Sequence, residues 1–199
     1  KASQLGAKVV TISGPDGYIL DEEGVSAEEK WDYLLDLRAS NNDVVAPYAK
    51  RFGAKFFPGA KPWEVPVDLA FPCAIQNELN GEDAKMLIAN GCKYAVETSN
   101  MGCTVEAVDV FQHARVAFAP GKAANAGGVA VSGLEMAQNS MKLAWTADEV
   151  DEKLHRIMTN IHAAGVANGT REDGTVDYVK GSNIAGFRKI ANAMIELGY

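Results

Sequence analysis

The sequence predicts an α/β fold in which a doubly wound parallel sheet carries helices on both faces. Short apolar runs rich in β-branched residues alternate with segments of helical spacing, and turn-forming residues separate them. After residue 120 the pattern becomes almost wholly helical. Compact apolar strands that alternate with helices are typical of parallel sheets, because the crossover helices bury both faces of the sheet.

Composition excludes several classes of protein. The 199 residues can form one domain, or one domain with an appendage. A net charge of −7 argues against a nucleic-acid binder. No apolar run approaches the length that spans a bilayer, and the start carries no signal-peptide core. The three cysteines show no CxxC spacing, which favours free thiols in a reducing, cytoplasmic compartment.

Local signals place the individual elements. The chain opens without an initiator Met, as the tail of a helix that ends at Gly6, so we expect it to be a portion of a longer protein. Capping boxes at 26–29 and 146–149 predict two helix starts, and 182–183 predicts the start of the last helix. The predicted strands are 8–12, 54–57, 67–71, 93–97 and 116–119; the predicted helices are 26–38, 43–52, 82–90, 104–113, 127–143, 146–162 and 182–197.

Open parallel sheets bind ligands at the carboxyl ends of their strands, and this rule selects four loops. The first is 13–16, where Asp16 can accept hydrogen bonds from the ribose hydroxyls of an adenosine and its charge disfavours a 2′-phosphate. The alternative is a Pro-Asp-Gly turn with a solvated Asp16. On local sequence alone the turn is favoured.

The second and third loops are rich in amide side chains. In 72–78, small residues allow close approach of a ligand, and Gln76 and Asn77 offer donors and acceptors. In 97–102, Asn100 can bond a carboxamide through both sides of its amide. A helix cap is the alternative for each loop.

The fourth loop, 120–133, is rich in small residues and leads into a helix, which suggests backbone held close to a ligand or to another helix. It is not a P-loop, because the upstream Gly is absent and Ala123 replaces the hydroxyl residue. Ser132 is not in a G-x-S-x-G elbow. His155 and His162 do not form a metal-binding pair, so we expect no metal.

Together these loops are more specific than any one of them. The runs TISGPDGY (11–18), PCAIQNE (72–78), SNM (99–101) and KAANAGGV (122–129) resemble glutamate dehydrogenase, most closely the bacterial hexameric type, over essentially the whole chain. The resemblance implies a Rossmann-like dinucleotide-binding domain over 1–126, with its first strand and Gly-rich turn missing. It also implies a helical segment over 127–199 that packs on the sheet or on the absent N-terminal domain.

The resemblance further implies a cytoplasmic homohexamer that interconverts L-glutamate with 2-oxoglutarate and ammonia. Its catalytic Lys and Asp would belong to the missing N-terminal domain, so we expect no catalytic residue in this chain and no activity from it alone. Asn100 would hold the nicotinamide carboxamide, and Ser132 would bond the substrate's side-chain carboxylate. The implied cofactor-binding residues are Ser13, Gly14, Asp16, Ala74, Gln76 and Asn100, and the implied substrate-binding residues are Asn125, Val129 and Ser132.

Two other functions are compatible with the sequence, and one position departs from the family's pattern. A leucine- or phenylalanine-type dehydrogenase shares the architecture, but the Ser132 hydroxyl suits a carboxylate and would be left unpaired by an aliphatic substrate. A nucleotide-binding regulatory or assembly module without chemistry is the alternative from another class. Ile75 stands where many relatives have Thr. Asp16 favours NAD, with NADP possible.

Overall fold

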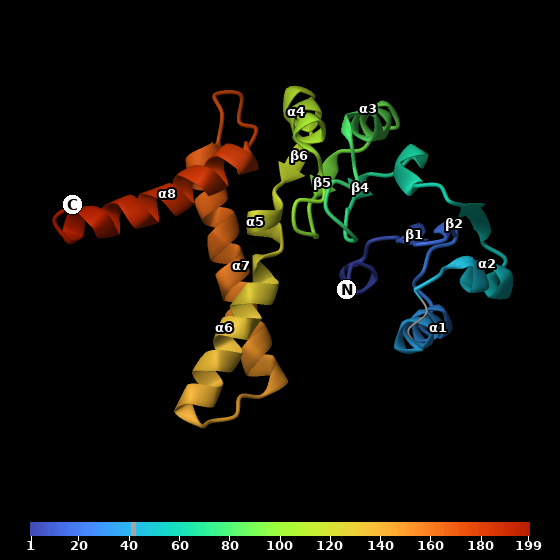
Figure 1. Ribbon diagram of the computed structural model, residues 1–199, viewed down its shortest axis with the longest axis horizontal. Coiled ribbons are helices and arrows are strands. Elements are labelled where there is room, and N and C mark those ends of the chain that lie inside the picture. Colours follow the sequence, from blue (N-terminus) through green and yellow to red (C-terminus); the bar gives the residue numbers. More distant parts are fainter. Residues whose placement is uncertain (41–42) are drawn as a thin grey trace. The chain divides into compact units, whose positions relative to one another are not determined.

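A computed structural model describes residues 1–40 and 43–199, and the chain divides into two compact units. Unit 1 is Lys1–Val65 and unit 2 is Pro66–Tyr199. Figure 1 shows the elements of both units in sequence colours. Each unit has its own three-stranded sheet, and each is described by itself.

Unit 1 is built on an antiparallel sheet. Strands β1 (Thr11–Gly14), β2 (Gly17–Leu20) and β3 (Lys55–Pro58) pair in the order β1-β2-β3, with Ser13 opposite Tyr18 and Tyr18 opposite Phe57. The β1–β2 connection is a two-residue turn. The next residue, Gly17, must be glycine: its φ is +137°, and a Cβ there would lie 2.1 Å from the carbonyl oxygen of Phe57.

Two helices cover this sheet. They are α1 (Glu28–Ala39) and α2 (Ala46–Phe52), and two 3₁₀ turns, η1 (Ser3–Leu5) and η2 (Pro62–Glu64), complete the unit. Tyr48 and Ile19 are fully buried at the centre, and Trp31 packs against this cluster and donates its indole N–H to the Val25 carbonyl at 3.0 Å. The unit therefore has its own apolar core, which brings together β2, α1 and α2.

A charged side chain lies inside that core. Asp21 is 6% exposed, and its Oδ2 accepts hydrogen bonds from Lys30 Nζ at 2.6 Å and from Tyr48 Oη at 2.7 Å. Burial alone would raise the pKa of Asp21, but these two bonds and the Lys30 charge outweigh it, so the net pKa is lowered. Burial and the Asp21 contact raise the pKa of Tyr48.

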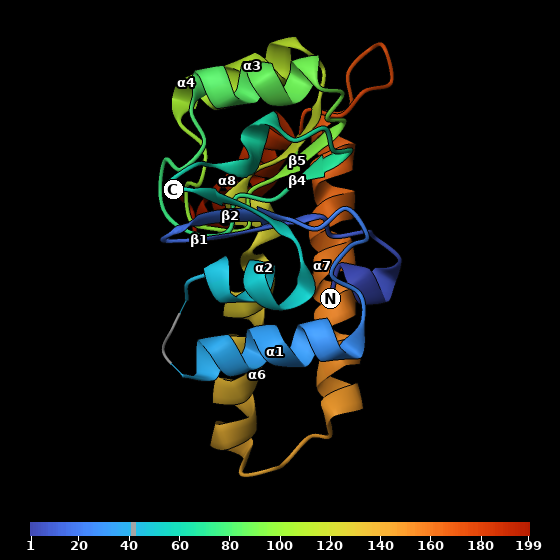
Figure 2. The same cartoon turned by 90° about the vertical axis from the view of Figure 1, so that its right-hand side faces the viewer.

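Unit 2 starts with a parallel sheet. Strands β4 (Leu69–Ala70), β5 (Tyr94–Val96) and β6 (Ala117–Ala119) lie in that order, with Ala95 opposite both Ala70 and Phe118. Helices α3 (Gly81–Ala89) and α4 (Val105–His113) lie side by side over this sheet (Figures 1 and 2). Phe111 of α4 stacks on Phe118 of β6 at a ring-centroid distance of 5.7 Å. These crossovers make the three strands parallel.

The rest of unit 2 is helical. A short α5 (Gly121–Ala124) leads into α6 (Ala126–Met141), which lies beside α7 (Ala147–Gly169); α8 (Tyr178–Glu196) then crosses α7 (Figure 1). The crossing depends on glycines. A Cβ on Gly181 would lie 2.1 Å from the carbonyl oxygen of Gly165, and one on Gly169 would lie 2.2 Å from that of Asp177.

The α/β fold with a parallel sheet and helices is confirmed, and several local predictions need correction. The predicted strand 8–12 is β1, shifted toward the turn, and β2 was missed. Both belong to an antiparallel sheet, because a two-residue turn can only return the chain antiparallel. The 146–149 capping box is confirmed, whereas α1 has no side-chain cap at Ala27. Helix α8 begins at Tyr178 and not at 182–183; its N-cap is Asp177, whose carboxylate accepts from Lys180 N at 2.9 Å.

Within the described ranges, 1–40 and 43–199, no helix is both long and apolar enough to cross a membrane. The same residues contain no grouping of three or more His, Cys, Asp or Glu side chains that could hold a metal ion.

Candidate functional site

A pocket of about 640 Å³ lies in unit 2 at the carboxyl ends of its strands. The loop after β4 and the loop after β5 form two of its walls, and the start of α6 forms the third. This is the edge of an open parallel sheet at which ligands bind. The lining residues are Cys73, Ala74, Ile75, Gln76, Thr98, Ser99, Asn100, Asn125, Gly128, Val129 and Ser132.

The pocket brings together site residues that the sequence predicted from three separate loops. Ala74 and Gln76 come from the first wall, Asn100 from the second, and the remaining three from the turn into α6 and its first two turns. Residues up to 58 positions apart therefore meet around one cavity. The three from the third wall are Asn125, Val129 and Ser132.

Backbone hydrogen bonds hold the first two walls together. The amides of Thr98 and Ser99 both donate to the carbonyl of Pro72 at 3.0 Å, and the amide of Asn77 donates to the carbonyl of Met101 at 2.8 Å. Asn77 and Met101 have φ values of +56° and +55°, so each bends its loop sharply. The loops after β4 and β5 thus form one connected structure.

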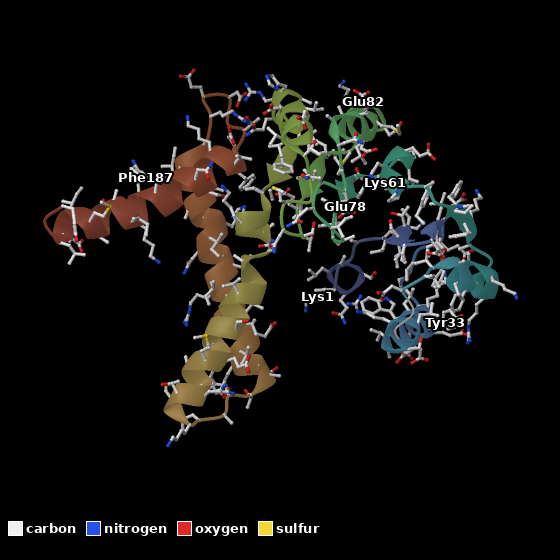
Figure 3. The ribbon with its side chains drawn as sticks, in the orientation of Figure 1. Lys1, Tyr33, Lys61, Glu78, Glu82 and Phe187 are labelled. Carbon is white, nitrogen blue, oxygen red and sulfur yellow. The ribbon has the colours of Figure 1, made fainter. Side chains whose placement is uncertain are left out.

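A side-chain bond also fixes the first wall. Glu78, labelled in Figure 3, accepts a hydrogen bond at its Oε1 from the amide of Ala74 at 2.7 Å. A carboxylate that bonds the backbone four residues earlier closes the loop on itself. This fixes the backbone on both sides of Ile75 and Gln76.

The second and third walls meet through a pair of asparagines. Asn125 Nδ2 donates to Asn100 Oδ1 at 2.9 Å. An amide side chain carries both a donor and an acceptor, so this bond uses one group of each residue. The Asn100 nitrogen and the Asn125 oxygen are the groups that the pair offers to a ligand.

The third wall is partly apolar. Val129 is 75% exposed on the first turn of α6, and Ser132 is exposed one turn further along the same face. Gly127 faces away from the pocket, where a Cβ would contact Leu154 and Met158 of α7 at ordinary distances. An exposed valine beside a hydroxyl suits a ligand with an aliphatic chain and a polar end.

One structural residue of the site was missed by the sequence-based reasoning. Glu97, the residue directly after β5, is 6% exposed. Its Oε1 accepts from Cys103 N at 2.9 Å and its Oε2 from Gly121 N at 2.7 Å. The signal available in the sequence was a lone acidic residue at the end of the apolar strand 93–97.

The pocket cysteine lacks the lowered pKa of an activated nucleophile. Cys73 lines the pocket, and desolvation by its surroundings raises the pKa of its thiol. Burial, with the charges of Glu97 and Glu78, raises the pKa of Cys103 to about 12. A nucleophilic cysteine needs a lowered pKa, so neither fits that role.

The remaining predicted cofactor residues lie in unit 1, on the β1–β2 hairpin: Ser13, Gly14 and Asp16. Asp16 is not simply solvated. Its carboxylate accepts from the amide of Val45 at 2.9 Å and from that of Ala46 at 2.9 Å, at the start of α2. Gly14 allows the backbone of Asp43 to approach closely, since a Cβ on Gly14 would lie 2.5 Å from the carbonyl oxygen of Asp43.

The fold and the pocket define a class: an α/β protein with a pocket at the carboxyl edge of a parallel sheet, the edge at which ligands bind in such folds. The family model for Glutamate/Leucine/Phenylalanine/Valine dehydrogenase matches residues 1–198. The chain belongs to this family.

Among curated relatives, the chain is 63% identical over all of its 199 residues to the NAD-specific glutamate dehydrogenase of Bacteroides fragilis (strain YCH46). It is 52% identical over 198 residues to the NADP-specific glutamate dehydrogenase of Escherichia coli (strain K12). In both comparisons the match covers 44% of the relative, so the chain spans less than half the length of these proteins.

Solved structures of glutamate dehydrogenases are also similar to this chain. A glutamate dehydrogenase structure superposes with a TM-score of 0.93 at 51% identity, covering 99% of this chain and 44% of that one. A Plasmodium falciparum glutamate dehydrogenase superposes with a TM-score of 0.92 at 43% identity, covering 99% of this chain and 42% of that one. The resemblance to glutamate dehydrogenase is confirmed.

Proposed function

We propose that the full-length protein containing this sequence catalyses the NAD(P)-dependent oxidative deamination of L-glutamate to 2-oxoglutarate and ammonia, and the reverse reaction. This chain supplies the cofactor-binding half of the active site. The observation that carries the proposal is the single pocket in which Asn100, Asn125 and Ser132 converge from three loops.

The first two walls fit a nicotinamide. A nicotinamide ring carries a carboxamide, and the side-chain nitrogen of Asn100 can donate to its oxygen. The small side chain of Ala74 leaves room for a flat ring, and Gln76 adds a second amide at the same wall. When bound, the cofactor supplies the hydride chemistry. The chain's own residues orient it.

The third wall fits glutamate. Val129 offers an apolar surface to the methylene groups of the substrate, and the Ser132 hydroxyl can donate to its side-chain carboxylate. Asn125 bonds Asn100, so it lies between the two binding regions. A leucine-type substrate would leave the Ser132 hydroxyl unpaired.

Proton transfer belongs outside this sequence. The family's catalytic Lys and Asp have no counterpart among the pocket-lining residues, which carry no charged side chain. General acid–base catalysis needs such a group within hydrogen-bond reach of the reacting atoms. The 199-residue chain is therefore expected to be inactive alone, and the intact protein to be a cytoplasmic homohexamer.

Cofactor preference is assigned to NAD. The Asp16 carboxylate is fixed by two α2 amides, and a fixed negative charge beside the ribose repels a 2′-phosphate. The relatives above include both NAD-specific and NADP-specific enzymes at 52% identity or more, so overall similarity does not decide between them.

The test is turnover by the purified full-length protein with L-glutamate, L-leucine and L-phenylalanine, each with NAD and with NADP. We expect glutamate with NAD to give the highest kcat/KM. A preference for leucine or phenylalanine would assign the protein to the other branch of the family. Nucleotide binding without turnover of any amino acid would favour the regulatory module. Glutamate turnover by the 199-residue chain alone would contradict the assignment of acid–base chemistry elsewhere.

A further inference from the structure

Glu97 connects three segments behind the pocket. Its backbone amide donates to the carbonyl of Ala119 at the end of β6, at 3.0 Å. Its two carboxylate oxygens accept separately from Cys103 N, at the end of the loop after β5, and from Gly121 N, at the start of α5. One buried side chain thus joins the loop that carries Asn100 to the turn that carries Asn125.

The two loops are packed tightly at this point. A Cβ on Gly121 would lie 3.0 Å from the carbonyl oxygen of Ser99 and 3.3 Å from Glu97 Oε2. Little room therefore exists for either backbone to shift inward. The carboxylate prevents an outward shift, because each of its oxygens holds one loop by a charge-assisted bond to a backbone amide.

This arrangement determines how far Asn100 lies from Asn125. Asn100 is three residues before Cys103, and Asn125 is four residues after Gly121. The side-chain bond between the two asparagines, 2.9 Å long, requires both loops to keep their places. If either amide left Glu97, its loop could move and the asparagines would separate.

We propose that Glu97 is a positioning residue for the reaction. Its carboxylate fixes the separation of the two loops, so that the nicotinamide-binding amide of Asn100 and the substrate-side amide of Asn125 act on their ligands at the same time. The proposal rests on the proposed function for the roles of the two asparagines. Glu97 itself acts through backbone amides and does not touch cofactor or substrate.

The test replaces Glu97 in the full-length protein. A Gln side chain has the same shape but only one acceptor oxygen, and its amide nitrogen would face an N–H donor. In Glu97→Gln we expect the KM values for cofactor and for glutamate both to rise about tenfold, the effect of one lost hydrogen bond in each complex. Hydrogen–deuterium exchange should become faster in peptides covering 98–104 and 119–125.

Asp177→Asn is the matched control. Asp177 is also a carboxylate of unit 2 that accepts from a backbone amide, that of Lys180, and it also bonds the side chains of Gln112 and Arg171. It lies at the α7–α8 junction and not on the pocket. We expect this variant to lose thermal stability with KM values unchanged, which separates positioning from general destabilisation.

Gly121→Ala is a second way to push apart the loop that carries Asn100 and the turn that carries Asn125, and it leaves the Glu97 carboxylate intact. Its Cβ would press on Ser99, so it should raise both KM values as Glu97→Gln does. The proposal is wrong if Glu97→Gln keeps wild-type KM values, or if its exchange rates change only as those of Asp177→Asn do. If Glu97→Gln does not fold while Asp177→Asn does, Gly121→Ala tests the proposal by the same KM values and exchange rates.

Failure of the proposed function has a different signature. If the wild-type protein does not turn over glutamate, the proposed function fails, but exchange at 98–104 and 119–125 and NADH binding by fluorescence still measure the effect of Glu97. Faster exchange with weaker NADH binding would support the loop-positioning role, and unchanged values of both would refute it.

Discussion

Asn125 donates a hydrogen bond to Asn100 across the gap between two loops, 25 residues apart in sequence. The bond places one amide on each side of the boundary between the proposed cofactor and substrate regions. It also couples them, since neither side chain can rotate without breaking it. The two residues were predicted separately, from motifs that contain no information about their contact.

Replacing Asn100 by Ala removes the amide assigned to the nicotinamide carboxamide. We expect the KM for the cofactor to rise about tenfold in the full-length protein, the effect of one lost hydrogen bond, with a smaller rise for glutamate through Asn125. Asn192→Ala, an exposed asparagine on α8, is the control and should match wild type. A larger effect on the KM for glutamate than on that for the cofactor would contradict the assignment.

Replacing Ser132 by Ala tests the choice of substrate. The hydroxyl is assigned to the side-chain carboxylate, so we expect the KM for L-glutamate to rise about tenfold. The KM for L-norvaline, which has no carboxylate on its side chain, should stay the same. Ser140→Ala, two turns further along α6, controls for changes in the helix. Equal effects on both substrates would remove Ser132 from the carboxylate site.

Replacing Asp16 separates its two roles. Asp16→Ala removes the acceptor for the amides of Val45 and Ala46 and should destabilise unit 1 by about 1–2 kcal/mol, as loss of a helix cap does. Asp16→Asn keeps one acceptor and loses the charge. It should raise the ratio of kcat/KM for NADP over NAD by roughly fivefold, and an unchanged ratio would show that the hairpin does not contact the ribose.

Replacing Gly181 by Ala tests the α7–α8 crossing. The added Cβ would meet the carbonyl oxygen of Gly165, so we expect a loss of at least about 2 kcal/mol in the free energy of unfolding. Gly186→Ala, on the same helix, has open space and should gain about 0.5–1 kcal/mol from helix propensity. Similar effects of the two substitutions would mean that the helices cross less closely.

Asp21 makes stability depend on pH. Its pKa is lowered in the folded state, so its contribution is fully present above the unfolded value of 3.8 and is lost as the pH falls through the lower folded value. Asp21→Asn leaves Lys30 without its buried partner and should cost about 3 kcal/mol at neutral pH. Urea unfolding followed by tryptophan fluorescence measures both the pH dependence of the free energy of unfolding and the cost of the substitution.

The control for this prediction is the pH profile of the variant. Asp21→Asn has no carboxylate at this position, so the difference in stability between wild type and variant should shrink as the pH falls below 3.8. A difference that stays constant over the acid range would mean that the Asp21 contacts do not depend on its charge.

The sequence by itself determined the order of the strands and of the longer helices in unit 2, and the Thr146–Glu149 capping box; the short helix α5 was not predicted. It also indicated the residues that line the pocket from three of the four predicted loops. These follow from short-range causes: hydrophobic period, capping side chains within one turn, and loops at the ends of strands. The predicted site residues of the β1–β2 hairpin, Ser13, Gly14 and Asp16, are an exception, because short-range patterns did not reveal their contacts. Asp16 accepts hydrogen bonds from two amides at the start of α2, about 30 residues away in sequence.

Only the tertiary structure decided the rest. Strand β2 exists because Tyr18 and Ile19 pair with both β1 and β3. Helix α8 begins after Asp177 because that carboxylate caps the helix and is held by Gln112 of α4 and by Arg171. Glu97 was missed for the same reason. Its partners Cys103 and Gly121 are backbone amides, which every residue but proline carries, so no pattern in the sequence marks them. Such contacts are determined by how distant segments pack.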